Sequence, residues 1–308
     1  MVQESGLAMI LPVLETAFFE LDKVRGELIM DKVCPQAREC IMGIKAYVPG
    51  KPIEDVQREY GLSDVIKLAS NENPLGISAK AKAAMADAIS SMYLYPDGNC
   101  TGLRGKLAQM LDVAKEQLIF GNGSDELIGL IAQTFVNPGD EVIVAEPTFS
   151  EYEFATLVMG GVLKKVPLVN FRHDLERMAD AINSKTRLIF ICNPNNPTGT
   201  IVKAKGVEAF LNRVPDDVVV IFDEAYREYV EDQDYPDPVY YIKSGKENII
   251  ALRTFSKIHA LAGLRIGYGI ASKDFIKLIA RTKEPFNVNL MAQKAALASL
   301  GDVEHLRN

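Results

Sequence analysis

The sequence predicts an α/β protein with a mainly parallel central sheet and helices on both faces of that sheet. Between residues 75 and 284, short apolar runs alternate with segments of helical periodicity. These runs lack a polar residue at every second position, which is typical of strands buried on both faces. Strands separated by helices favour parallel pairing, because the helix carries the chain back across the sheet.

The length and charge of the chain narrow the function classes. Its 308 residues allow one large domain or two unequal ones. A net charge of -7, with no block of Lys or Arg, gives no electrostatic reason to expect nucleic acid or a membrane surface as partner. No apolar run approaches the roughly 20 residues that span a bilayer. The apolar residues 6–14 follow no basic segment, so no signal peptide is expected.

The cysteines and histidines indicate neither a metal site nor a disulfide framework. Cysteines stand at positions 34, 40, 100 and 192 without a Cys-x-x-Cys pair, and the chain has three histidines. No metal ligand set is therefore expected. Reduced thiols in a cytoplasmic protein fit this pattern best.

The N-terminal part of the chain carries no recognisable chemistry. Residues 1–33 are expected to form a helical arm, because Leu14, Phe18 and other apolar residues recur on one helical face. Residues 34–74 are expected to be irregular, with Pro49-Gly-Lys-Pro52 as a cluster of helix-breaking residues.

Regular structure is expected after Leu75. Helices are predicted over residues 79–90 and 288–300, and Tyr95-Pro-Asp-Gly98 predicts a turn. The predicted strands are residues 117–120, 142–145, 188–192, 218–222, 249–252 and 267–271.

Polar stretches follow five of these predicted strands. They are Gly121-Asn-Gly-Ser-Asp125, Glu146-Pro-Thr-Phe149, Asn193-Pro-Asn-Asn-Pro197, Asp223-Glu-Ala-Tyr226 and Arg253-Thr-Phe-Ser-Lys257. In open α/β sheets, ligands bind outside the carboxyl ends of the strands. The five stretches are therefore expected to converge on one site.

The glycine-rich stretch is a candidate anion site. Ser124 can cap the helix that follows, and free N–H groups in the first helical turn can bind a phosphate. A plain capped helix is the simpler interpretation of this motif alone. It is not a dinucleotide fingerprint, because Glu126 stands where a third glycine is needed, and the chain contains no Walker A sequence.

Lys257 gives the site a specific chemistry. A lysine amine can form a Schiff base with an aldehyde cofactor, and burial near the strand ends would favour its neutral form. Arg265, with Thr254 and Ser256, can hold a phosphate through charge-assisted hydrogen bonds. A solvated surface charge is the usual role of a lone lysine.

Asp223 completes the pattern of a pyridoxal-phosphate (PLP) site. A lone Asp at this place is more often a helix cap, but beside Lys257 it can keep a pyridine nitrogen protonated. Tyr226 and Asn196 can donate to the phenolic oxygen of the ring. Phe149 is most simply a core aromatic, and in this context it could stack on the ring.

Taken together, the motifs resemble those of fold-type I PLP aminotransferases, and specifically of the histidinol-phosphate aminotransferases. The likeness covers about residues 34–300. The matching stretches are Lys67-Leu-Ala-Ser-Asn-Glu-Asn-Pro-Leu-Gly76, Tyr95-Pro-Asp-Gly98, Gly121-Asn-Gly-Ser-Asp-Glu126, Cys192-Asn-Pro-Asn-Asn-Pro-Thr-Gly-Thr200, Asp223-Glu-Ala-Tyr226, Arg253-Thr-Phe-Ser-Lys257 and Leu261-Ala-Gly-Leu-Arg-Ile-Gly-Tyr268.

The resemblance implies a role for each matching residue. Lys257 would bind the cofactor and then move the proton between substrate and cofactor, and Asp223 would pair with the pyridine nitrogen. Asn73 would lie at the substrate pocket, and Tyr95 would reach the phosphate in the partner subunit of a homodimer. Asn196 and Tyr226 would hold the phenolic oxygen, and Ser124, Asp125, Thr254, Ser256 and Arg265 would surround the phosphate.

The resemblance also implies a reaction and a domain organisation. The reaction transfers the amino group of L-histidinol phosphate to 2-oxoglutarate, giving imidazole acetol phosphate and L-glutamate in histidine biosynthesis. Residues 34–74 would belong to the small domain and dimer arm, and residues 75–284 would form the PLP-binding domain. Residues 285–308 would begin a small domain that is incomplete here, because the family's carboxylate-binding arginine lies further on. The chain would then bind PLP but transaminate poorly.

Three alternatives stay open from the sequence. An aromatic amino-acid aminotransferase and a threonine-phosphate decarboxylase share the same motifs. The third alternative belongs to another functional class: a PLP-binding fragment that lacks full catalytic activity. One departure from the family pattern is the segment Ile258-His259-Ala260, where a small or aromatic residue and then glycine are commoner. A packing or surface variant is a simpler explanation for His259 than a ligand.

Overall fold

The computed structural model describes residues 36–46 and 50–307 and divides the chain into two units, Met1–Lys45 and Ala46–Asn308. The predicted helical arm at residues 1–33 and the cysteine at position 34 lie outside the described residues. In the first unit, the described residues contain the short helix α2 (Glu39–Met42).

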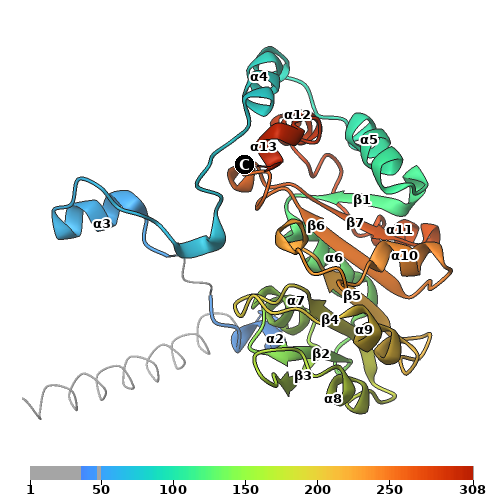
Figure 1. Cartoon of the computed structure of the whole chain (residues 1–308). Coiled ribbons are helices and arrows are strands. Elements are labelled where there is room, and N and C mark those ends of the chain that lie inside the picture. Colours follow the sequence, from blue (N-terminus) through green and yellow to red (C-terminus); the bar gives the residue numbers. More distant parts are fainter. Residues whose placement is uncertain (1–35, 47–49, 308) are drawn as a thin grey trace, which may run out of the picture. The chain divides into compact units, whose positions relative to one another are not determined.

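The second unit contains a seven-stranded sheet with the strand order β1-β7-β6-β5-β4-β2-β3 (Figure 1). The strand β7 runs antiparallel to both of its neighbours, and the other described pairings are parallel. The strands are β1 (Leu118–Gly121), β2 (Glu141–Glu146), β3 (Val162–Pro167), β4 (Thr186–Cys192), β5 (Val219–Asp223), β6 (Ile249–Thr254) and β7 (Gly267–Ala271). The expected mainly parallel sheet is therefore confirmed.

Helices connect the strands and precede and follow the sheet. The α-helices are α3 (Ile53–Tyr60), α4 (Ala79–Ala88), α5 (Thr101–Leu111), α6 (Ser124–Phe135), α7 (Glu151–Val158), α8 (Leu175–Asp180), α9 (Ala204–Leu211), α10 (Pro238–Lys243), α11 (Lys273–Ile279), α12 (Leu290–Ser299) and α13 (Val303–Arg307). Short 3-10 turns are η1 (Ala69–Asn71), η2 (Ile89–Ser91), η3 (Lys115–Gln117), η4 (Arg227–Tyr229) and η5 (Ala262–Leu264). No helix among these described segments is long and apolar enough to cross a bilayer.

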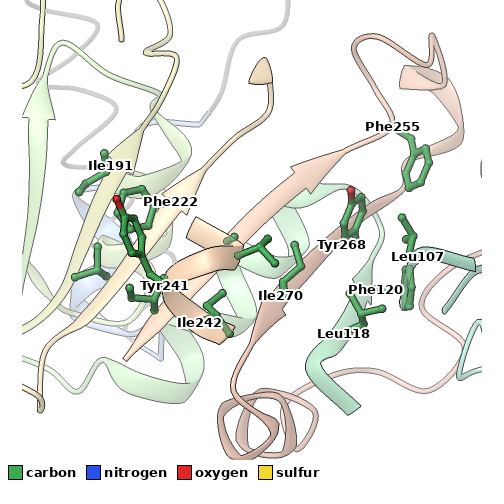
Figure 2. Packing of buried hydrophobic residues seen from close by; sticks show 14 of the residues in the cluster. Leu107, Leu118, Phe120, Ile191, Phe222, Tyr241, Ile242, Phe255, Tyr268 and Ile270 are labelled. Atoms are coloured by element: carbon green, nitrogen blue, oxygen red, sulfur yellow. The ribbon is translucent and has the colours of Figure 1, made fainter. Parts of the chain in front are cut away.

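The side chains of successive strand residues point to opposite faces of the sheet, and each face has its own hydrophobic core. Ile191 and Phe222 belong to the core that includes Leu107 of α5 and Tyr241 of α10 (Figure 2). The next residues along the same strands, such as Phe190, belong to the core formed with α6, α7 and α11. This alternation explains why the strands are continuously apolar, since both of their faces are removed from water.

The six predicted strands all form, within two residues of their expected ends. The strand β3 was not predicted, because it lies at the sheet edge and its sequence Val162-Leu-Lys-Lys-Val-Pro is mostly solvent-facing. The expectation of irregular structure in residues 34–74 is wrong for α3. That helix begins after Pro52 and ends at Gly61, whose φ of 64° gives a left-handed C-cap.

Candidate active site

The carboxyl ends of the parallel strands bring the polar stretches to one edge of the sheet. Cys192 and Asp223, the last residues of β4 and β5, are direct partners in the parallel ladder. The backbone N–H of Glu224 donates to the carbonyl of Leu252 in β6 at 2.9 Å, so the ladder continues past the end of β5. The positions of these residues follow directly from the strand register.

An arginine and a helix N-terminus form the positive part of the site. The Arg265 guanidinium donates to the Asp125 carboxylate at 2.8 Å and to the Ser256 hydroxyl at 3.4 Å. The helix α6 starts at Ser124, and the Arg265 guanidinium lies against Gly123, the residue before it, so Arg265 and the start of α6 share one region. These groups suit an anion, because the helix dipole and the guanidinium act together.

Two glycines permit this close approach. Gly123 caps α6 with a φ of 86°, and a Cβ there would overlap the Arg265 guanidinium. A Cβ at Gly267 would lie 2.6 Å from the backbone nitrogen of Ser124. The predicted cap by Ser124 is therefore wrong, since Ser124 is the first helical residue and the cap position belongs to Gly123.

Lys257 is half-buried on the loop after β6. Its Nζ donates to the Ser70 carbonyl at 3.1 Å and lies 5.5 Å from the ring centroid of Tyr226. Burial lowers the pKa of Lys257, and the nearby charge of Arg265 adds to this effect against the opposing influence of Asp125 and other acids. A lowered pKa increases the neutral, nucleophilic fraction of the amine.

Asp223 is 2% exposed and has no ion-pair partner among the described residues. The Tyr152 hydroxyl donates to one carboxylate oxygen at 2.7 Å, and the Ala225 N–H donates to the other at 3.1 Å. Burial raises the pKa of Asp223 to about 6, and the two hydrogen bonds oppose that rise. The site thus holds a carboxylate that a cationic ligand atom would stabilise.

Residues before α4 reach the same region. The Asn71 side chain donates to the Tyr226 hydroxyl at 3.0 Å, and the Asn73 side chain donates to the Ile258 carbonyl at 3.1 Å. Asn73, expected at the substrate pocket, therefore lies next to the residue that follows Lys257. The contacts of Ser70 and Asn71 were not anticipated, although both belong to the segment that resembles the family.

The loop after β4 is a turn whose conformation is held by side chains. The buried Asn195 side chain accepts from Thr148 at 2.8 Å and donates to Thr198 at 2.9 Å, and the His173 ring lies 3.1 Å from its oxygen. The backbone N–H of Asn196 contacts the Cys192 sulfur at 3.4 Å, which places this residue near Asp223.

Phe149 packs edge-on against Tyr152, with ring centroids 5.6 Å apart, at the end of β2. Thr254 accepts from the Ser256 N–H at 3.1 Å, within the stretch that leads to Lys257. These contacts bring Phe149, Thr254 and Ser256 to the same edge as Lys257 and Asp223. Tyr152, Thr148, Asn195 and His173 are additional residues of this edge that were not predicted as site residues.

Tyr95 and His259 differ from the others. Tyr95 is 83% exposed, and its described ring contact is with Phe286 at 4.8 Å. His259 is buried 4.8 Å from the Phe255 ring, and burial lowers its pKa to about 4, which supports the packing explanation. Within the described residues, no group of three or more side chains could hold a metal ion.

Comparisons with known proteins show the family of the chain. The model of the family aminotransferase class I and II matches residues 63–308. Histidinol-phosphate aminotransferase of Moorella thermoacetica is 58% identical over 272 residues, which cover 88% of this chain and 70% of that protein. The enzyme of the same name from Caldicellulosiruptor saccharolyticus is 54% identical over 269 residues, covering 87% and 75%.

A solved structure extends the comparison to the fold. The structure of histidinol-phosphate aminotransferase from Sinorhizobium meliloti in complex with pyridoxal-5'-phosphate has a TM-score of 0.81 and 28% identity. The match covers 89% of this chain and 73% of that one. The fold-type I architecture expected from the sequence is thereby confirmed, and the chain belongs to the class I and II aminotransferases.

Proposed function

We propose that this chain transfers the amino group of L-histidinol phosphate to 2-oxoglutarate, with pyridoxal phosphate as cofactor, in histidine biosynthesis. The observation that carries the proposal is the arrangement of Lys257, Asp223 and Arg265 along one sheet edge. The relatives that share more than half of their aligned residues with this chain carry the same activity in their names. An aromatic aminotransferase and a phosphothreonine decarboxylase are less well supported.

The residues present fit this cofactor. When bound, pyridoxal phosphate supplies an aldehyde that reacts with amines and a protonated ring that withdraws electrons from the substrate. Arg265 and the first turn of α6 suit its phosphate, because Gly123 leaves the space for a close approach. The buried carboxylate of Asp223 suits its ring nitrogen, since it forms no ion pair within the described residues.

Lys257 is proposed to act twice. Its amine, with a pKa lowered by burial, first attaches the cofactor. With substrate in the site, the free lysine amine would take a proton from the alpha carbon of the substrate and deliver it to the cofactor. Tyr226, whose ring faces Lys257, is proposed with Asn196 to donate to the phenolic oxygen. Phe149 is proposed to stack on the ring.

The remaining sites complete the proposal. Asp125, Ser124, Thr254 and Ser256 are proposed to surround the phosphate with Arg265. Asn73 is proposed to contact the substrate, which its position beside Ile258 supports. Residues 75–284 are proposed as the cofactor-binding domain, flanked by small-domain segments at residues 34–74 and 285–308. A cytoplasmic location belongs to the same proposal, because the reaction is a step of amino-acid biosynthesis.

A homodimer with shared sites is also proposed. Ile66, Leu68, Tyr93 and Tyr95 are each more than four-fifths exposed, and they lie on the stretches before and after α4. Large apolar side chains exposed in this number favour a protein partner. In a symmetric dimer, Tyr95 of each subunit is proposed to reach the phosphate in the other subunit's site.

The reaction is tested by comparing amino donors. With 2-oxoglutarate as acceptor, kcat/KM should be higher for L-histidinol phosphate than for phenylalanine or aspartate, because the pocket is proposed to recognise a phosphate and an imidazole. Steady-state glutamate formation measures this. A higher value for phenylalanine would move the assignment to the aromatic enzymes, and release of CO2 from phosphothreonine would move it to the decarboxylases.

The attachment site is tested by reduction. Treating the PLP-loaded protein with borohydride should leave the cofactor covalently bound to Lys257, which peptide mass spectrometry detects. Lys257→Ala should abolish the label, whereas Lys165→Ala, on the edge strand β3, should retain it. A label on another lysine in the unchanged protein would show that the assignment is wrong.

The phosphate site is tested with two glycines of the same helix region. In Gly123→Ala, the new Cβ meets the Arg265 guanidinium at a left-handed φ, so PLP affinity should fall by about 10-fold or more. Gly129→Ala, inside α6 with open space around it, should leave PLP affinity unchanged. Absorbance titration measures both. Equal affinities for the two variants would contradict the proposed anion site.

The counter-ion is tested in the apoprotein. The change in the Asp223 pKa from 3.8 to about 6 corresponds to about 3 kcal/mol. Because the folded-state pKa is raised, the folded apoprotein has its full stability below about pH 4, where Asp223 is protonated. This stability is lost as the pH rises through about 6 and the buried acid ionises. Asp223→Asn should therefore be more stable than the unchanged apoprotein at pH 7.5, and this advantage should shrink toward pH 4.

Urea unfolding at the two pH values measures that difference. With PLP present at pH 7.5 the order should reverse, since a ring cation would stabilise the carboxylate but not the amide. If Asp223→Asn is less stable than the unchanged apoprotein at pH 7.5, burial of the Asp223 carboxylate does not destabilise the folded protein.

A further inference from the structure

The hydroxyl of Tyr152 occupies an unusual position in the core. Tyr152 lies in the first turn of α7 and is completely buried. Its ring stacks on Phe190 with centroids 4.5 Å apart and an interplanar angle of 10°. The hydroxyl at the far end of this ring donates to the Asp223 carboxylate at 2.7 Å. A residue of the hydrophobic core thus ends in a direct contact with a charged group of the site.

We propose that Tyr152 is a positioning residue for the reaction, whose hydroxyl orients the Asp223 carboxylate and keeps the shared proton on the ring nitrogen of the cofactor. The inference rests on the proposed function, because Tyr152 acts through Asp223. In a pair made of a carboxylate and a pyridine nitrogen, the proton lies on the more basic atom. A donor to the carboxylate lowers its basicity, so it favours the protonated ring.

The surroundings of Asp223 explain why this donor matters. The described residues give the carboxylate two hydrogen-bond donors, the Tyr152 hydroxyl and the Ala225 N–H. Asp125 of α6 and Glu224 after β5 both raise its pKa. Its charge also acts on Lys257, whose pKa it raises, and on Tyr226. Cys192, its ladder partner in β4, has a buried thiol whose pKa is raised to about 12, so it stays neutral.

The hydroxyl of Tyr152 cannot become a charged competitor. Burial and the nearby Asp223 charge raise the pKa of Tyr152 well above its usual range. The group therefore remains an O–H donor throughout the working pH range. A role in packing alone would need the ring but not the hydroxyl, and phenylalanine would fill the same space between Phe149 and Phe190.

The test removes the hydroxyl of Tyr152 and, as a control, the hydroxyl of a buried tyrosine that does not contact Asp223. Tyr152→Phe keeps the stacked ring and removes the donor to Asp223. Tyr241→Phe, a buried tyrosine of α10 in the other core, is the matched control. Asp223→Ala is the reference for complete loss of the counter-ion. For each protein, PLP affinity and the 15N chemical shift of ring-labelled PLP are measured across pH, together with apoprotein thermal unfolding.

Tyr152→Phe should bind PLP about 10-fold more weakly or worse, as expected for loss of a hydrogen bond to a charged group. Its 15N resonance should move toward the value of a neutral pyridine, while Tyr241→Phe matches the unchanged protein. In the Asp223→Ala background, Tyr152→Phe should cause no further change. Placing 3-fluorotyrosine at position 152, a stronger donor of similar shape, should shift the resonance the other way.

The outcomes separate this inference from the proposed function. If Asp223→Ala changes affinity and resonance but Tyr152→Phe and the fluorinated residue change neither, Tyr152 is a packing residue and the inference is wrong. If Asp223→Ala also changes neither, the counter-ion role of Asp223 is wrong. If Tyr152→Phe does not fold, the fluorinated protein alone decides, because its packing is almost unchanged.

Discussion

The candidate site depends on the carboxylate of Asp223, which is buried and forms no ion pair within the described part of the chain. The adjacent Glu224 is buried too, but it forms an ion pair with Arg253 at 2.8 Å and accepts from Tyr235 at 3.3 Å. Two neighbouring buried acids therefore differ in whether the chain supplies an ion-pair partner. The charge of Glu224 is balanced within the chain, whereas the charge of Asp223 is supported by two hydrogen bonds and is favoured by a cation from outside.

Backbone hydrogen bonds fix the position of Asp223 at the end of β5. The backbone carbonyl of Asp223 accepts from the Asn193 N–H at 3.0 Å, so the β4–β5 ladder extends to the end of both strands. Strand ends held in this way fix Asp223 and the loop of Asn196 relative to each other. Lys257, by contrast, lies on a loop, and its amine is held by the Ser70 carbonyl. The proposed partner of the ring nitrogen is thus at a strand end, and the proposed proton carrier is on a loop.

The sequence was sufficient for the sheet and for much of the site, and the reasons differ by residue. Buried strands are visible as apolar runs, and Asp223 stands out because it ends such a run. The strand β3 has no such signal, since most of its residues face water. Tyr152 could not be recognised, because an aromatic residue on an amphipathic helix has the same pattern whether or not its hydroxyl meets a charge. Asn195 reads as a turn residue, and its buried network depends on Thr148 and His173, which are distant in sequence.

The lysines of β3 have a consequence for how neighbouring molecules meet. As the last strand in the sheet order, β3 presents an edge at which a strand of another molecule could pair. Lys164 forms an ion pair with Glu141 at 3.5 Å, and Lys165 forms one with Glu153 at 2.9 Å. An incoming strand would have to displace hydrated charges along this edge. Lys164 and Lys165, whose charges make β3 unlike a buried strand in the sequence, therefore protect the folded protein against edge-to-edge aggregation.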